Sequence, residues 1–179
     1  MKLLVDVNVV LDVLLERHPH VDASAALWAA VERRAVEGFV SAHGVTTVFY
    51  LVARHRDARL ARRVVSDLVS VFGIAPVDAQ VIRRALDLAW ADFEDAVCAA
   101  AAEASACDAV VTRDPRGFVD PPVPVLDPIA ALAWVDESRG PERISERVAT
   151  NGSREARAKP GTARRASRRV RRNTAVQAR

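Results

Sequence analysis

Short apolar runs alternate with helical patterns along residues 1–137, and this alternation limits the chain to few folds. The first run, residues 2–7, is too apolar for a half-exposed strand and indicates a strand covered on both faces. Strands separated by helices form βαβ units, in which the strands run parallel and helices cover both faces of the sheet. The pattern therefore predicts an α/β fold with a central parallel sheet between layers of helices.

Capping residues and glycines divide this region into its expected elements. Asp78, Asp92 and the pair Asp127-Pro128 stand where a helix N-terminus needs a side-chain acceptor or a preset backbone angle. Gly38 and Gly73 are expected to end the helices that precede them. Strands are expected over residues 2–7, 39–41, 74–77, 108–112 and 123–126, and helices over 21–35, 45–53, 60–71 and 92–105, after Asp78, after Asp127 and, briefly, after Asn8.

The charge of the chain changes sign near residue 138. Residues 1–137 hold 13 Lys and Arg against 20 Asp and Glu, a net charge of −7, whereas residues 138–179 hold 13 against 3, a net charge of +10. The second segment contains no aromatic residue, so it cannot bury enough apolar surface to offset its ordering entropy. We expect a folded domain over 1–137 and a basic, arginine-rich tail over 138–179 that is disordered or weakly helical.

Other features of the sequence concern the cellular compartment. No apolar run reaches the ~18 residues that a membrane-spanning helix needs. Residues 1–13 carry Asp6 and Asp12 and lack a small-residue cleavage site, so they do not resemble a secretory signal. Cys98 and Cys107 form no CxxC or Cys/His cluster, which argues against a disulfide framework or a structural zinc site. We expect a cytoplasmic protein with no membrane partner and with both cysteines buried.

Carboxylates follow two of the expected strands. Asp6 ends the first strand, and Asp114 comes after the strand that ends at Thr112. Sites in parallel sheets lie beyond the carboxyl ends of the strands, so these two acids are expected at the same edge. A carboxylate at the end of a buried strand needs a charged or hydrogen-bonding partner.

A third acidic group, Asp92-Phe93-Glu94-Asp95, opens the alanine-rich helix. Asp92 is expected to cap this helix, which places Asp95 one turn deeper and toward the sheet. Three carboxylates at one point repel each other unless a cation joins them, and oxygen-only ligands suit Mg²⁺ or Mn²⁺. Such an ion activates a water molecule and stabilises phosphoryl charge. The reaction expected is therefore phosphodiester hydrolysis.

Plainer readings stay open for single residues. An acid at such a position is more often a helix cap or a solvated turn residue than a metal ligand. Asp6 is the exception, because nothing next to it in the sequence needs its carboxylate as a cap. For Asp12 and Asp108, a merely structural or solvated role is as plausible as a role in the site. The four histidines have no metal-ligand spacing.

Three segments taken together resemble the PIN domain, in particular the VapC-type toxins. They are Asp6-Val7-Asn8, Asp92-Phe93-Glu94-Asp95, and Val110-Val111-Thr112-Arg113-Asp114 followed by Phe118. The resemblance covers residues 1–137. It implies a three-layer α/β/α sandwich with an acidic site, Mg²⁺ or Mn²⁺ as cofactor, and endoribonuclease activity on RNA. It also implies the role of toxin in a type II toxin–antitoxin system, with a cognate antitoxin and frequent homodimers.

The resemblance assigns roles to individual residues. Asp6, Asp95 and Asp114 match the family's acidic ligands, and Asn8 and Thr112 match accessory polar positions beside them. We add Glu94 or Asp92 as candidates to orient a water molecule, and Arg113 as a candidate contact for phosphate.

The sequence departs from the family at one position. Many members carry a glutamate on the helix after the second strand, where this chain has Thr47. A hydroxyl group cannot replace the charge of a carboxylate. Either Glu94 or Asp92 compensates, or the site holds one ion where other members hold two, or the activity is weak.

The same residues are compatible with other functions. A phosphohydrolase of the haloacid-dehalogenase kind would use Asp6 as nucleophile but needs a lysine near the phosphate, and the only lysines are Lys2 and Lys159. A PIN-like protein that binds RNA or an antitoxin without cleavage is the main alternative, since Thr47 replaces a carboxylate. The tail can bind RNA phosphates, fold back on the acidic site, or remain an inert solvated extension.

Overall fold

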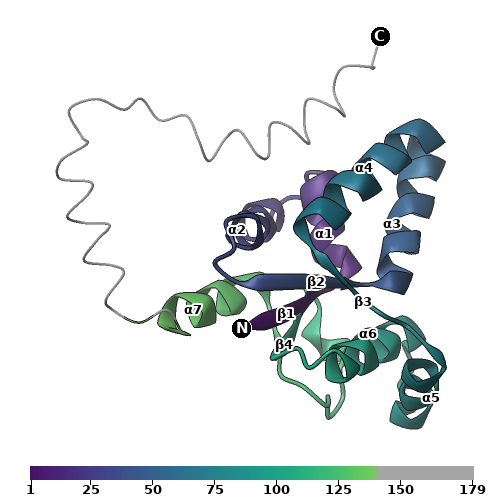
Figure 1. Cartoon of the computed structure of the whole chain (residues 1–179), viewed down its shortest axis with the longest axis vertical. Coiled ribbons are helices and arrows are strands. Elements are labelled where there is room, and N and C mark those ends of the chain that lie inside the picture. The colour runs from purple at the N-terminus through teal and green to yellow at the C-terminus, as the bar shows by residue number, and fades with distance from the viewer. Residues whose placement is uncertain (139, 141–179) are drawn as a thin grey trace.

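The computed structural model describes residues 1–138 and 140. Five parallel strands form one sheet in the order β3-β2-β1-β4-β5 (Figure 1). The prediction of an α/β fold with a central parallel sheet is confirmed. The prediction for the basic tail falls on residues that lie, apart from 138 and 140, outside the described part. The strands are β1 (Lys2–Val5), β2 (Glu37–Ser41), β3 (Gly73–Ala75), β4 (Ala109–Val111) and β5 (Val125–Leu126).

The described residues also form seven α-helices and one short 3₁₀ helix, of which the last α-helix follows β5 and the others lie between strands. None of the described helices is both long and apolar enough to cross a membrane. The helices are α1 (Val7–Leu14), α2 (Val21–Glu32), α3 (Ala42–His55), α4 (Ala58–Val71), α5 (Ala79–Leu88), α6 (Phe93–Ala104) and α7 (Pro128–Ser138), and the 3₁₀ helix is η1 (Pro115–Gly117).

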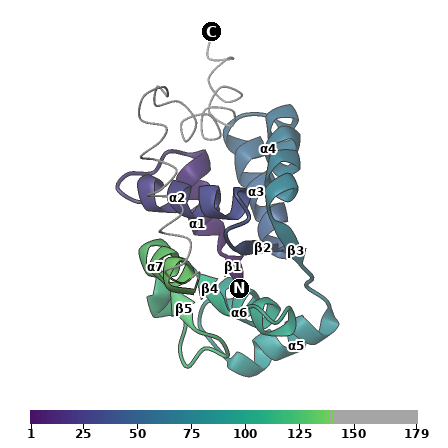
Figure 2. The same cartoon turned by 60° about the vertical axis from the view of Figure 1, so that its left-hand side comes forward.

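The helices lie in two layers because successive strand residues point to opposite faces of the sheet. Leu3 and Val5 of β1 join a core with α1, α2, α3, α4 and α7, whereas Leu4 joins a second core with α5 and α6. Figure 2 shows α5 and α6 on the side of the sheet away from α3 and α4. The arrangement is an α/β/α sandwich, with Cys98 and Cys107 both buried as expected.

Several helix boundaries follow the expected capping chemistry. Asp78 accepts from the backbone N–H groups of Gln80 and Val81, and Asp127 accepts from Ala130 N at 2.8 Å. The start of α3 was placed too late, because Ser41 caps it by accepting from Gly44 N at 2.9 Å. These hydrogen bonds satisfy N–H groups that the helix itself leaves without partners.

The end of α2 was predicted wrongly. The helix stops at Glu32, and Arg34, with a positive φ of 56°, turns the chain into β2. Gly38 lies inside β2, where a side chain would collide with Val31 and Phe72. The glycine therefore allows α2 to lie close to the sheet, and does not end the helix.

The strand order places the carboxyl ends of β1 and β4 side by side. Val5 is the register partner of Val111, so Asp6 and Thr112 leave the sheet next to each other. The chain builds the sheet from β1 toward β3 and then crosses to the other side for β4. This reversal between β1 and β4 is the position where open α/β sheets form sites.

Candidate active site

Asp6 leaves β1 at this reversal and stands just before the first turn of α1. Its Oδ2 accepts a hydrogen bond of 2.8 Å from the hydroxyl of Thr112, the residue after β4. Burial is the main cause that raises the pKa of Asp6, and the nearby negative charge of Glu94 also raises it. Hydrogen bonds from the Thr112 hydroxyl and from the backbone N–H groups of Val7 and Asn8 act in the opposite direction. Asp6 is thus a partly buried carboxylate next to other acids.

Thr112 is fully buried and its hydroxyl joins three groups. It donates to Asp6 and accepts from Asn8 Nδ2 at 2.9 Å and from the backbone N of Asp114 at 3.2 Å. One donor and two acceptor sites are all that a hydroxyl group offers. Asn8 Oδ1 in turn accepts from the backbone N of Arg113 at 3.1 Å. These bonds fix the chain after β4 to the start of α1.

The start of α6 brings further carboxylates to this edge. Asp92 caps the helix as expected, with its Oδ1 accepting from the backbone N of Glu94 at 2.9 Å and of Asp95 at 3.2 Å. Asp95 is half-buried beneath it. Gly117 of η1 passes so close that a side chain there would collide with Asp95 Oδ2. A side chain at position 117 would therefore force the Asp95 carboxylate to move.

The electrostatics of Asp95 show that the acids converge. Burial is the main cause that raises the pKa of Asp95 to about 7, followed by the negative charges of Asp92, Asp6, Glu94 and Asp114. The carboxylates of β1, the chain after β4 and the start of α6 therefore act on one group. Mutual repulsion of this kind is characteristic of functional sites.

Asp114 lies at the same edge but points to a different partner. Its carboxylate accepts from Arg116 Nε at 2.9 Å and Nη2 at 3.1 Å. The Arg116 hydrogen bond is the main cause that lowers the pKa of Asp114. Within the described residues, no three His, Cys, Asp or Glu side chains are placed so that they could hold a metal ion.

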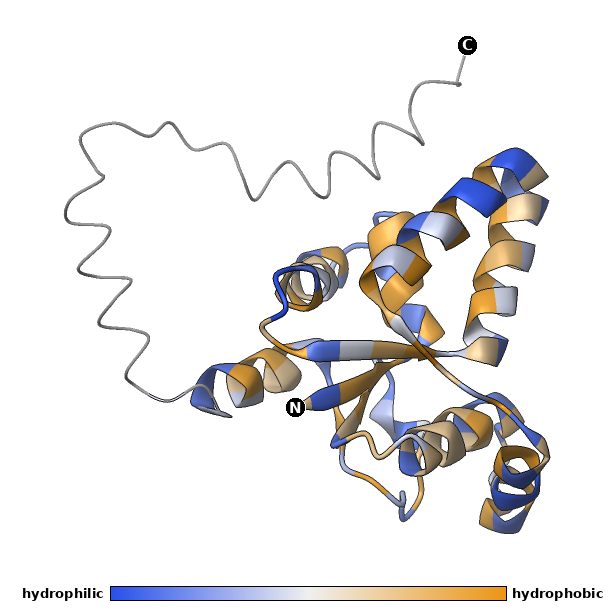
Figure 3. Cartoon of the chain, in the orientation of Figure 1, coloured by the Kyte–Doolittle hydropathy of each residue, from blue (hydrophilic) through white to orange (hydrophobic). Residues whose placement is uncertain are grey.

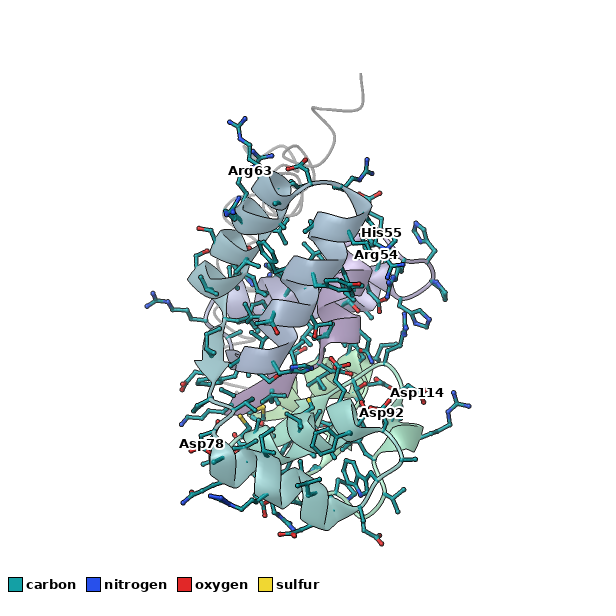
Figure 4. The ribbon with its side chains drawn as sticks, turned by 90° about the vertical axis from the view of Figure 1, so that its right-hand side faces the viewer. Arg54, His55, Arg63, Asp78, Asp92 and Asp114 are labelled. Atoms are coloured by element: carbon teal, nitrogen blue, oxygen red, sulfur yellow. The ribbon has the colours of Figure 1, made fainter. Side chains whose placement is uncertain are left out.

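Glu94, at the start of α6, lies next to α3 at the level of Thr47. Thr47 Oγ1 donates to Glu94 Oε1 at 3.3 Å, and His43 Nε2 lies 3.5 Å from the same oxygen. Figure 4 shows Asp92 and Asp114 on the same side of the molecule, below the end of α3.

A partly buried ion pair beside the site was not predicted from the sequence. Asp12 on α1 is completely buried, and its carboxylate accepts from Arg113 Nη1 at 2.7 Å and from Ser24 Oγ at 3.4 Å. The signal available in the sequence is an acid between the buried residues Leu11 and Val13. Arg113 is thereby held against α1. Asp108 lies at the opposite edge of the sheet, where it accepts from Lys2 N.

The sheet with its carboxylates at the β1–β4 reversal defines an α/β protein with an acidic site. Residues 2–116 match the family model of the PIN domain. The chain belongs to the PIN domain family. No match was found among curated protein sequences.

Solved structures with the same fold include three from bacteria. VapBC2 from Rickettsia felis, bound to a DNA fragment from its promoter, has a TM-score of 0.58 at 15% identity over 71% of this chain and 98% of its own. FitAcB from Neisseria gonorrhoeae has a TM-score of 0.57 at 23% identity over 71% of this chain and 98% of its own. VapC20 from Mycobacterium tuberculosis is described as a sarcin-ricin loop cleaving toxin. It has a TM-score of 0.54 at 16% identity over 64% of this chain and 92% of its own. At these identities the likeness concerns the fold.

Proposed function

We propose that this protein is a metal-dependent endoribonuclease that cleaves RNA phosphodiester bonds. The observation that carries the proposal is the position of Asp95, where burial first, and then the negative charges of Asp92, Asp6, Glu94 and Asp114, raise its pKa to about 7. A cluster of repelling acids destabilises the protein unless a cation neutralises it. The place of this cluster at the reversal point of the sheet supports binding of a cation and chemistry at phosphate.

The donor set fits Mg²⁺ or Mn²⁺. All candidate ligands are carboxylate oxygens, and these hard ions prefer oxygen ligands and keep several waters. We assign Asp6, Asp95 and Asp114 as the ligands. Asp114 would have to turn from Arg116 to be a ligand; both partners of that pair are mostly exposed, and such pairs contribute little to stability.

The bound ion would supply an activated water molecule and neutralise charge on the transferred phosphoryl group. In the hydrolysis a water oxygen bonds to phosphorus, one ester P–O bond breaks, and the leaving oxygen takes up a proton. Thr112 holds Asp6 in place by donating to its carboxylate, and Asn8 in turn donates to the Thr112 hydroxyl. Glu94, which accepts a hydrogen bond from Thr47 at the edge of the site, or Asp92 is the candidate to orient the water molecule. Because Arg113 is paired with Asp12, we assign it to positioning the chain before Asp114.

We extend the proposal to partners and compartment. Three of the solved structures with this fold are described as VapBC2, FitAcB and a toxin–antitoxin complex from Klebsiella pneumoniae. This likeness supports a cytoplasmic toxin that pairs with a cognate antitoxin and forms a homodimer. Co-purification with the product of a neighbouring small reading frame tests the partner.

RNA cleavage by the full-length protein tests the activity. We expect cleavage with Mg²⁺ or Mn²⁺, none in EDTA, and none in the Asp6→Asn variant. Asp136→Asn removes an exposed carboxylate from α7, outside the site, and should cut like the wild type. A wild-type rate in folded Asp6→Asn would refute the proposal.

A protein of the same fold that binds without cleaving is the second candidate. Two observations favour it: Thr47 replaces a carboxylate, and Asp114 is paired with Arg116. A metal ion that binds only the native state raises the melting temperature. A melting temperature unchanged by Mg²⁺ and Mn²⁺ would favour this second function.

A further inference from the structure

The outward side of α3 carries four polar or aromatic side chains in a row. His43, Thr47, Tyr50 and Arg54 follow one another at intervals of four, three and four residues, so they share one side of the helix. The buried residues of α3 are Gly44, Val48 and Val52, on another side. We call these four residues the α3 stripe.

One end of the α3 stripe lies at the acidic site. His43 and Thr47 both approach Glu94, at 3.5 Å and 3.3 Å. Arg54 stands seven residues beyond Thr47, which corresponds to about 10 Å along a helix. Figure 4 shows Arg54 on the same side of the molecule as Asp92 and Asp114. The stripe therefore leads from the carboxylates toward the tip where α3 meets α4, which Figure 3 shows as hydrophilic.

Tyr50 and Arg54 form the outer part of the stripe. Tyr50 is 58% exposed, and neither of the two aromatic pairs among the described residues includes it. Arg54 Nη1 donates to the Tyr50 hydroxyl at 3.4 Å. The ring thus presents an uncovered aromatic face beside a cation.

Arg54 differs from the two arginines nearest in sequence to Asp114. Arg113 is paired with Asp12, and Arg116 is paired with Asp114. Among the described residues Arg54 forms no ion pair with a carboxylate. A polyanion that approaches the acidic site can therefore use the Arg54 guanidinium without breaking an existing ion pair.

We propose that the α3 stripe is a binding track for single-stranded RNA, in which Tyr50 stacks on an unpaired base and Arg54 binds a phosphate group. The proposal rests on the proposed nuclease function, because the track leads to its carboxylates. Stacking needs a base that is free of a duplex and is tolerant of sequence. A protein partner is disfavoured, because one aromatic ring among polar groups is a small apolar surface for a protein interface.

Two measurements on the full-length Asp6→Asn protein test the track. The probe is a single-stranded uridine oligonucleotide of about 12 nucleotides, within the range of single-strand sites. It carries a fluorescent label for binding and, in a second version, 4-thiouridine for photocrosslinking. We expect a crosslink to the peptide that contains Tyr50, and its loss in Tyr50→Ala.

The binding series separates stacking from charge. Tyr50→Ala should weaken RNA binding about 10-fold. Tyr50→Phe keeps the ring, so its RNA affinity should stay within about twofold of the parent. Arg54→Gln should weaken binding and lower the salt-dependence slope by about 0.7. Arg62→Gln is the matched control. It removes the same charge from exposed Arg62 on α4, whose buried side is formed by Leu60, Ala61, Val64 and Leu68, and should stay within about twofold.

Defined outcomes overturn the track. They are equal affinity of Tyr50→Ala and its parent, crosslinks confined to residues after 138, or a Tyr50→Ala change in oligomeric state without a change in RNA affinity. The nuclease function is tested separately by wild-type cleavage. Tyr50-dependent binding without cleavage at any metal concentration contradicts the nuclease, whereas Asp6-dependent cleavage with Tyr50-independent binding contradicts the track alone.

Discussion

Thr47 on α3 donates its hydroxyl to Glu94 at the start of α6, with 3.3 Å between Thr47 Oγ1 and Glu94 Oε1. Position 47 is where the resemblance places a glutamate, and the carboxylate beside it comes from another helix. The pair of residues thus provides one hydroxyl and one carboxylate at the edge of the acidic site. We interpret Glu94 as the group that supplies the charge that position 47 lacks.

Exchange of the two side chains tests this interpretation. Glu94→Gln should lower RNA cleavage roughly 10- to 100-fold, as is usual for groups that support a metal site. Adding Thr47→Glu to that variant should restore most of the lost rate, because the charge returns to the same place. Thr47→Gln in the Glu94→Gln background is the neutral control. Failure of the glutamate to rescue, with the fold intact by circular dichroism, would remove Glu94 from the site.

Asp95 should make the metal-free protein less stable as the pH rises. Its pKa is about 7 in the folded protein against 3.8 for an unperturbed aspartate, so the folded state holds the proton more tightly. Its contribution to stability is complete below pH 3.8 and is lost as the pH rises through 7. Asp95→Asn removes this loss.

Chemical denaturation in EDTA measures the effect. At pH 8 we expect Asp95→Asn to be more stable than the wild type by on the order of 1 kcal/mol, allowing for solvent screening of a half-buried group. The difference should shrink as the pH falls toward 4. A variant that is less stable than the wild type at pH 8 would show that the carboxylate is not under repulsion.

Arg116 should compete with the metal ion for Asp114. The Arg116 guanidinium holds the Asp114 carboxylate through two hydrogen bonds, although both side chains are largely exposed. Arg116→Ala frees the carboxylate, so we predict Mn²⁺ binding that is tighter by up to about fivefold. Arg84→Ala breaks a comparable exposed pair with Glu103 on α6 and serves as control. Weaker Mn²⁺ binding in Arg116→Ala alone would contradict the competition.

The ion pair between fully buried Asp12 and partly exposed Arg113 predicts an asymmetric cost of mutation. Arg113→Gln leaves a completely buried carboxylate without its cation, which should destabilise the protein by about 3 kcal/mol. Adding Asp12→Asn removes the buried charge and should recover most of that free energy of unfolding. Urea denaturation of the single and double variants measures both values. A double variant no more stable than Arg113→Gln would mean that the charge is not the cause.

Much of the fold could be predicted from local patterns. The helix starts after Asp78, Asp92 and Asp127 follow from side chains that accept N–H groups within three residues. The parallel sheet follows from the alternation of elements, and the shared edge of Asp6 and Asp114 follows from the parallel sheet. The end of α2 could not be predicted in this way. Arg34 takes a positive φ there, and Gly38 is a glycine because α2 packs closely on β2.

The side-chain partners within the site could not be predicted in the same way. Asp12 meets Arg113 across 101 positions of the chain, and Thr47 meets Glu94 across 47. Such contacts depend on how whole helices pack on the sheet, which no window of sequence contains. Asp114 was expected to face the other acids, but Arg116, two residues away, takes its carboxylate. This local competition is visible in the sequence only when Arg116 is considered as a partner.

A calorimetric titration with Mn²⁺ at pH 8 is the most direct test that acids from separate parts of the chain bind one ion. At this pH Asp95, with a pKa of about 7, is mostly ionised before the ion binds. We predict saturable binding to the wild type and to Asp136→Asn, and loss of binding in both Asp6→Asn and Asp95→Asn. Binding of Mn²⁺ that is equally tight in all four proteins would contradict a metal site built from these carboxylates.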